Sequence, residues 1–236
     1  MPAKISNGIE DAVARHFNAI ARDYDFWKKK NYFYQKNLRE LLQALVPADA
    51  MILDIGCGTG DMLASLKPSF GLGIDISERM IERANQKYAG RAHISFATEN
   101  LLSRTAPFEN FDVVIMIDVL EHLADPAKFL EKISFLAPKH AKIIVSVANP
   151  LWEPILWAAE KLGQKMPEGP HERMSLAATE SIFRQSGFRI AKKGYRMLIP
   201  RNIWGADWIN KNFYKIRILV PLGFIAYWVL ERDERR

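Results

Sequence analysis

The sequence predicts an α/β protein built on a seven-stranded, mostly parallel sheet, with a helical segment before it and an antiparallel hairpin at its end. Between residues 51 and 147, short apolar runs alternate with amphipathic helical stretches, as expected for strands buried on both faces of a parallel sheet. Before them, residues 10–46 have a helical period. After them, two more strand-like runs complete the seven.

The first predicted element is a pair of helices. Apolar residues recur three or four positions apart at Val13, Phe17, Ile20 and Tyr24, and a second helix over 34–46 ends at Pro47. We therefore expect an N-terminal helical cap over residues 1–47. The remaining residues, 48–236, form the predicted sheet domain.

Five apolar runs predict the parallel strands: Met51–Ile55, Leu72–Ile76, Ile94–Phe96, Val113–Ile117 and Ile143–Val147. Helices are predicted at Ser77–Tyr88 and Pro126–Leu136, and later at Leu151–Leu162 and Leu176–Ser186. The antiparallel pair is predicted at Phe188–Ile199 and Phe224–Leu230. Residues 150–173 and 200–217 are expected to be insertions that face an acceptor or a membrane.

The strongest chemical motif follows the first strand. Glycines at 56, 58 and 60 let the backbone turn tightly and approach a ligand, and the helix that begins there offers free N–H groups. A dinucleotide fingerprint would need glycine at position 61, where the sequence has Asp61. A carboxylate opposes a pyrophosphate and suits an amine or a sulfonium.

A second motif ends the second strand. Asp75 stands 19 residues after Gly56, where a carboxylate accepts hydrogen bonds from both hydroxyls of an adenosine ribose. Ser77 is a natural N-cap for the next helix.

These segments together resemble the class I S-adenosylmethionine (SAM)-dependent methyltransferases. The resemblance rests on LDIGCGTG at 53–60, GIDIS at 73–77, FDVVIMIDVLEHL at 111–123 and IIVSV at 143–147. Residues 16–25 resemble the cap helix of quinone and small-molecule methyltransferases of this class. Segments 149–154 and 163–167 resemble bacterial methyltransferases fused or adjacent to lipid-linked glycosyltransferases.

The resemblance implies a Rossmann-like fold that binds SAM and releases S-adenosylhomocysteine. It places the methionine part of SAM at Gly56, Cys57, Gly58 and Gly60, with Asp54 and Asp61 near its amine. It places Asp75 and Ile76 at the ribose, Glu99 and Asn100 at the adenine, and Asp118 to His122 beside the methyl group. Position 98–100 reads Thr-Glu-Asn where the family usually has an aspartate, so the adenine partner stays open.

Methyl transfer to a protonated acceptor needs a base, for which His122 and His16 are the candidates. Asp118, Glu121 and His122 also resemble the metal-binding variant of some quinone O-methyltransferases. The alternative is that they only pack below the site, and we expect no metal. Tyr24, Trp27, Tyr32 and Trp152 are expected on the acceptor side, the alternative being core packing.

Composition and charge limit the function classes. The 236 residues are 49% hydrophobic and contain one cysteine, which excludes general disorder, an internal disulfide and a cysteine-based zinc site. The net charge of +6 lies within residues 150–236, which suggests an anionic partner there. No signal peptide or membrane-spanning helix is expected.

We therefore expect a cytoplasmic SAM-dependent methyltransferase with an amphipathic small-molecule or lipid-linked acceptor, of quinone or polyprenyl-glycan type. Residues 201–230 mix aromatic and basic residues and could touch the inner face of an anionic membrane. One alternative is an RNA methyltransferase, although no RNA-binding module is evident. Another is a non-catalytic partner of a membrane enzyme. The sequence leaves open the acceptor, the methylated atom and the oligomeric state.

Overall fold

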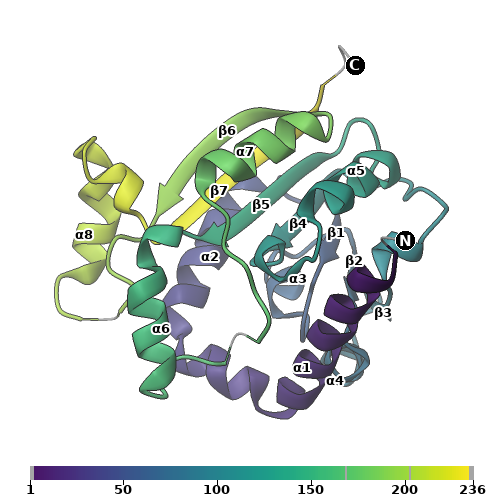
Figure 1. Cartoon of the computed structure of the whole chain (residues 1–236), viewed down its shortest axis with the longest axis horizontal. Coiled ribbons are helices and arrows are strands. Elements are labelled where there is room, and N and C mark those ends of the chain that lie inside the picture. Colours follow the sequence, from purple (N-terminus) through teal and green to yellow (C-terminus); the bar gives the residue numbers. More distant parts are fainter. Residues whose placement is uncertain (1–2, 168, 202, 234–236) are drawn as a thin grey trace.

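The computed structural model describes residues 3–167, 169–201 and 203–233. Its centre is a seven-stranded sheet in the order β3-β2-β1-β4-β5-β7-β6 (Figure 1). The strands are β1 (Met51–Ile55), β2 (Phe70–Asp75), β3 (Ile94–Thr98), β4 (Val113–Ile117), β5 (Lys142–Ala148), β6 (Phe188–Arg196) and β7 (Ile225–Arg232). The first five are parallel, and β7 pairs antiparallel with both β5 and β6. The predicted fold class is confirmed.

The helices are α1 (Ala3–Lys30), α2 (Tyr32–Leu45), α3 (Asp61–Ser65), α4 (Glu78–Tyr88), α5 (Pro126–Leu136), α6 (Glu153–Lys161), α7 (Leu176–Gln185) and α8 (Ala206–Asn212). Single 3₁₀ turns occur at η1 (Leu101–Ser103), η2 (Leu120–His122), η3 (Pro150–Trp152), η4 (Phe213–Lys215) and η5 (Val220–Leu222). The strand predicted over Phe188–Ile199 is shorter in the structure, where β6 ends at Arg196. Met197 has a left-handed backbone, φ 61°, which turns the chain out of the sheet.

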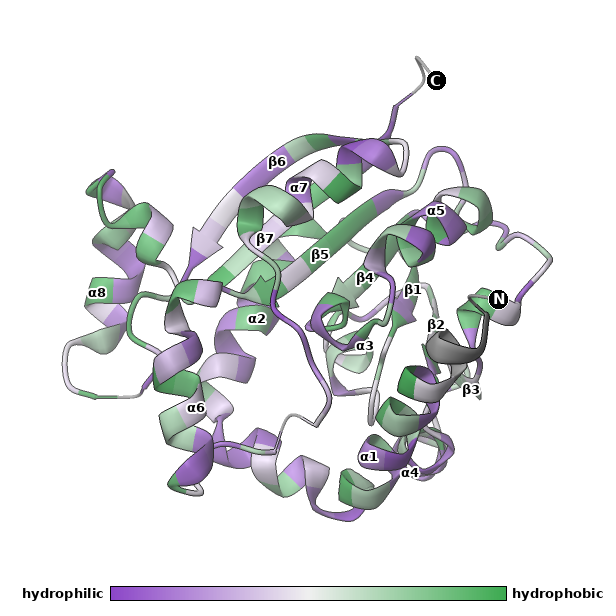
Figure 2. Ribbon diagram, in the orientation of Figure 1, coloured by the Kyte–Doolittle hydropathy of each residue, from purple (hydrophilic) through white to green (hydrophobic). Residues whose placement is uncertain are grey.

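Alternating side chains of each strand build two separate cores. Ile52 on β1 packs in a cluster with apolar residues of α2, α3 and α4 on one face of the sheet. Its neighbour Leu53 packs with residues of α5 and α7 on the other face. Both faces of the sheet are therefore covered, which explains why the central strands β4 and β5 are mostly apolar, whereas the edge strand β6 carries several charged residues (Figure 2).

The strand order reverses beside β1, which lies between β2 and β4. Connections from the carboxyl ends of β1 and β4 diverge at this point, and doubly wound sheets bind their ligands in the crevice that results. The glycine loop after β1 and Asp118 after β4 both stand at this edge. Topology therefore brings the predicted site residues together. The proposed boundary between the cap and the sheet domain, at 47/48, stays a prediction.

The structure corrects the predicted membrane-contact range of 201–230. Residues 225–232 form β7, which lies between two other strands, and Trp228 and Leu230 are completely buried. A strand covered on both faces and paired on both edges cannot contact a membrane, so the candidate surface shrinks to residues 201–222. In the described ranges, no helix is both long and apolar enough to cross a bilayer.

Ser77 both caps a helix and ties the cap to the sheet domain. Its hydroxyl accepts a hydrogen bond from Met80 N at 3.2 Å and donates one to Asn18 Oδ1 on α1 at 2.8 Å. We expect Ser77→Ala to lower the free energy of unfolding by about 1–2 kcal/mol, measured by urea denaturation. Ser175→Ala is the matched control, because Ser175 caps α7 in the same way at Ala178. Equal losses in both variants would contradict a role for the tie to α1.

Candidate active site

A cavity of about 770 Å³ opens at the carboxyl ends of β1, β2 and β4. Helices α1, α2 and α6 supply the opposite wall, together with residues of the segment between α6 and α7. We call this segment, residues 163–167 and 169–173, the strap. The volume is in the upper part of the range for small-molecule sites, which leaves room for a cofactor and part of a second ligand.

The glycine loop after β1 forms the floor of the cavity. Gly56 and Gly58 have φ of 73° and 55°, a left-handed conformation that favours glycine. A Cβ on Gly56 would lie 2.6 Å from Val119, so any side chain there would collide with the wall. Gly60, with φ 81°, faces Phe96 and Tyr88 instead of the cavity. Its role is therefore to shape the loop.

Asp75 is held in place by the backbone of the loops around it. Its Oδ2 accepts from Gly58 N at 2.8 Å and its Oδ1 from Ser77 N at 2.9 Å. Burial raises the pKa of this carboxyl despite those two donors. A carboxylate has about four acceptor positions, so Asp75 can also accept from two ribose hydroxyls in the cavity that it lines.

Asp54 is a buried acidic residue whose carboxyl group can accept a further hydrogen bond. The side chain is on β1 and only 2% of the residue is exposed. In the described part of the chain, its Oδ2 atom has no hydrogen-bond partner. Burial raises the pKa of Asp54 to about 7. A buried acceptor beside a cavity that it lines fits a cationic ligand group such as the amine of SAM.

Lys28 on α1 brings a cation to the same cavity. Its Nζ lies 4.7 Å from the centre of the Tyr24 ring. Burial opposes the charge of this amine, but Tyr24, Asp61 and Asp54 outweigh burial and raise the pKa of Lys28. A protonated lysine opposite a carboxylate suits a zwitterion, so the residues present fit the amino-acid end of SAM. Lys28 was not among the site residues predicted from the sequence, because nothing in the basic run 28–30 indicates contact with a cavity.

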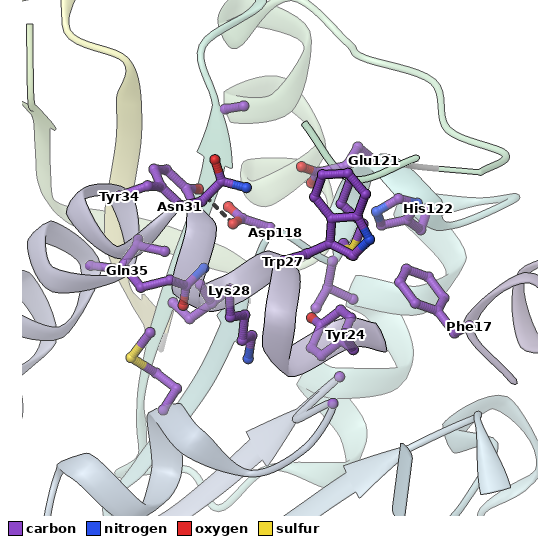
Figure 3. A pocket seen from close by; sticks show the side chains of 18 of the residues that line it. Phe17, Tyr24, Trp27, Lys28, Asn31, Tyr34, Gln35, Asp118, Glu121 and His122 are labelled. Carbon is purple, nitrogen blue, oxygen red and sulfur yellow. Dashed lines mark hydrogen bonds between the residues drawn. The ribbon is translucent and has the colours of Figure 1, made fainter. Parts of the chain in front are cut away.

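Asp118 stands at the centre of the cavity in a strained backbone conformation (Figure 3). Its φ is 55°, which is uncommon for a residue with a side chain and typical of functional sites. Tyr34 Oη donates to Asp118 Oδ2 at 2.5 Å, and Ser146 Oγ donates to Oδ1 at 3.3 Å. Tyr34 was read from the sequence only as the start of a helix.

The strap fixes the two histidines differently. His122 lines the cavity, and its Nδ1 lies 3.0 Å from the carbonyl oxygen of Pro170. The ring of Phe17 packs edge-on against it at 5.2 Å (Figure 3). His16 is not among the cavity-lining residues, and its Nε2 contacts the Pro167 carbonyl at 3.1 Å. Of the two histidines predicted as candidate bases, His122 lines the cavity and His16 does not.

The other predicted cofactor residues are at the wall, where several already have partners. Arg104 Nη1 donates to both carboxylate oxygens of Glu99, at 2.9 and 3.1 Å. Asn100 donates to Glu10 Oε2 at 2.8 Å. Cys57 and Ile76 also line the cavity.

Asp61 was predicted near the amine of SAM, but it lies away from the cavity. Its carboxylate accepts from Tyr88 Oη and pairs with Lys87, each at 2.6 Å.

All four predicted acceptor-side aromatics line the cavity: Tyr24, Trp27, Tyr32 and Trp152. Trp152 Nε1 donates to the Leu222 carbonyl at 2.9 Å, which fixes its ring. Phe17 also lines the cavity, although the sequence reading gave it only a packing role. No group of three His, Cys, Asp or Glu side chains among the described residues could hold a metal ion.

Comparison with known proteins identifies the family. The profile of a family described as a methyltransferase domain matches residues 26–193. The chain belongs to the class I SAM-dependent methyltransferases. Among solved structures of similar fold, magnesium protoporphyrin IX methyltransferase from Synechocystis with bound S-adenosylhomocysteine has a TM-score of 0.63. It is 21% identical, and the match covers 95% of this chain and 99% of that one. A SAM-dependent methyltransferase from Thermotoga maritima reaches 0.70 at 18% identity, covering 94% and 100%.

Curated methyltransferase relatives include enzymes named ubiquinone biosynthesis O-methyltransferase. The protein of Coxiella burnetii is 25% identical over 141 residues, which is 57% of this chain and 60% of the relative. That of Rhodopseudomonas palustris is 30% identical over 128 residues, or 51% and 50%. The chain thus spans about half to three fifths of the length of the curated relatives it matches.

Proposed function

We propose that the protein is an enzyme that uses SAM to methylate an amphipathic small-molecule or lipid-linked acceptor. The observation that carries this proposal is the division of one cavity into two chemically different ends. The end at β1 and β2 has carboxylates and backbone N–H groups, including Asp54 and Asp75. The end at α1, α2 and α6, which we call the apolar end, has aromatic side chains such as Phe17, Trp27 and Trp152, with polar ones between them, including Asn31 and Gln35.

Each end has a distinct task. When bound, SAM supplies a methyl group on a sulfonium, which is already activated for in-line displacement. Asp75 would hold the ribose, while Asp54 and Lys28 would hold the amine and carboxylate of the methionine part. The aromatic wall would align the acceptor and exclude water, which together account for much of the rate of such a transfer.

An acceptor hydroxyl would also require removal of a proton. His122 lines the cavity and is oriented by its contact with Pro170, so we infer that it is the base. The relatives named ubiquinone biosynthesis O-methyltransferase support an oxygen atom as the acceptor of the methyl group. A polyprenyl-linked glycan would also fit a cavity with an apolar wall.

The test is transfer of a radioactive methyl group from labelled SAM to a total lipid extract. We expect label in the organic phase, and we expect His122→Ala to lower the rate about 100-fold while leaving SAM affinity unchanged. Calorimetry with SAM on the same preparation measures that affinity.

Three results would contradict the proposal. Label recovered only in added RNA would favour an RNA methyltransferase. SAM binding without transfer to any extract would argue against a lipid-soluble acceptor. Absence of SAM binding would favour a non-catalytic partner role.

A further inference from the structure

An exposed apolar surface lies on the side of the cavity formed by α6 and the residues after β6. We call it the mouth patch. It consists of Leu151, Ile155, Trp157, Leu162, Ile203, Trp204, Trp208, Ile216, Ile218 and Leu222. Within the described ranges, 14 large apolar side chains are exposed, and ten of them belong to these two segments. Exposed apolar residues scattered singly need no explanation, but a concentration of this kind does.

The two segments of the mouth patch lie together at the cavity opening. Trp152 Nε1, beside α6, donates to the carbonyl of Leu222 at 2.9 Å. Ile155 from α6 and Ile203 from the segment before α8 both line the cavity and are both exposed. Helices α6 and α8 are neighbours in Figure 1, and green apolar residues recur on both in Figure 2. The patch therefore adjoins the entrance to the apolar end.

The exposure of individual side chains in the mouth patch is extreme. Trp204 is 100% exposed, Ile218 82% and Trp208 72%. No described residue covers the Trp204 side chain, so in the isolated chain its whole indole faces water. Removing such rings from water is strongly favourable, and a partner that does so would bind tightly.

Positive charges predominate in the second segment of the mouth patch, whereas the α6 segment contains Glu153, Glu160 and Lys161. Residues 200–222 contain Arg201, Lys211, Lys215 and Arg217 but only one acidic residue, Asp207. All four cationic residues are exposed, and Asp207 lies 3.7 Å from Lys36, which offsets its charge. A mixture of tryptophan and isoleucine with lysine and arginine is typical of segments that lie in a membrane interface.

We propose that the mouth patch docks on an anionic lipid surface and opens the apolar end of the cavity toward it. This inference rests on the proposed function, because an acceptor dissolved in lipid could then enter the cavity without crossing water. A nucleic acid fits less well: bases stack on aromatic faces, but Ile155, Ile216 and Ile218 offer branched aliphatic surface that gains most from hydrocarbon.

Vesicle sedimentation tests the docking. Wild-type protein is expected to sediment with phosphatidylglycerol vesicles at low salt, less at high salt, and weakly with phosphatidylcholine vesicles. The double variant Trp204→Ser with Trp208→Ser should lower the partition at least tenfold, because two indoles are no longer removed from water on binding. Phe135→Ser is the matched control: Phe135 is an exposed aromatic on α5, outside the mouth patch, and its loss should leave sedimentation unchanged.

Charge variants and SAM calorimetry complete the test. Lys211→Glu with Lys215→Glu should weaken binding to phosphatidylglycerol while leaving binding to phosphatidylcholine unchanged. Protein that binds SAM but stays in the supernatant at low salt would overturn the docking and leave the proposed function standing. Protein that sediments but fails to bind SAM would overturn the function and leave the docking standing.

Two further outcomes would also overturn lipid docking. In the first, size-exclusion chromatography shows a dimer that becomes monomeric in the double tryptophan variant, so that the patch is a contact between copies. In the second, polyuridylate binds, the lysine variants abolish that binding, and phosphatidylglycerol vesicles fail to sediment the protein.

Discussion

Replacing Asp75 by alanine is expected to weaken SAM binding by about 3 kcal/mol, roughly a hundredfold in Kd. Two effects add. The ribose hydroxyls lose a charged acceptor, and hydrogen bonds to ionised groups are the stronger kind. The N–H groups of Gly58 and Ser77, which donate to this carboxylate at 2.8 and 2.9 Å, lose the group that orders the loop. Calorimetric titration with SAM measures the change.

A matched control separates loss of the ligand contact from loss of any aspartate. Asp112 also accepts a hydrogen bond from a backbone donor, Met51 N at 2.8 Å. It comes directly before β4, at the amino ends of the strands, and does not line the cavity. Asp112→Ala should leave SAM affinity unchanged. Equal affinities for wild type and Asp75→Ala would refute the ribose role.

SAM binding is expected to become about tenfold tighter between pH 6 and pH 7.5, and Asp54→Asn should remove most of that dependence. Burial raises the pKa of Asp54 to about 7 in the ligand-free protein, so the carboxyl is largely protonated at pH 6. The amine of SAM needs the ionised form. Binding therefore competes with a proton below pH 7 and does so little above it.

The same pKa shift predicts an opposite trend in the stability of the ligand-free protein. The folded pKa of about 7 lies above the ordinary value of 3.8, so the protonated group favours the folded state. That stabilisation is complete below about pH 4 and is lost as the pH rises through 7. Its size is at most about 4 kcal/mol, at roughly 1.4 kcal/mol per pKa unit.

Asp54→Asn should accordingly have a higher Tm than wild type at pH 8 without ligand, and the advantage should shrink at pH 5. Asp112→Asn should show no such pH-dependent gain, which makes it the control. If Asp54→Asn lowered the Tm equally at both pH values, Asp54 would be a structural carboxylate rather than one kept available for a cation.

The fold followed closely from the sequence because its elements are defined locally. The apolar run Met51–Ile55 and the helix Pro126–Leu136 have the same bounds in prediction and structure. Turn chemistry was harder to foresee: β6 ends where Met197 adopts a left-handed conformation, which no pattern of apolar residues signals. Residues 225–230 were predicted both as part of a strand and as the end of the membrane-contact range 201–230, and only their pairing with β5 and β6 shows that they are interior.

The site was predictable where motifs specify backbone geometry and less so where long-range contacts decide. Gly56, Gly58 and Asp75 come from two consecutive strand ends, so spacing alone places them together. Tyr34 and Asp118 are 84 residues apart and meet only in the fold. From the sequence alone, a tyrosine on an amphipathic helix is interpreted as a core-packing residue, because its hydrogen-bond partner is not visible there.

The sole thiol of the chain has a practical consequence. Cys57 is 4% exposed, and burial raises its pKa well above the usual range. A Cβ on Gly73 would come within 2.9 Å of its sulfur, so this side is sealed by backbone. Alkylating reagents react with accessible thiolates, so Cys57 should stay inert. A cysteine introduced elsewhere could then carry a spectroscopic label without any change to the native sequence at position 57.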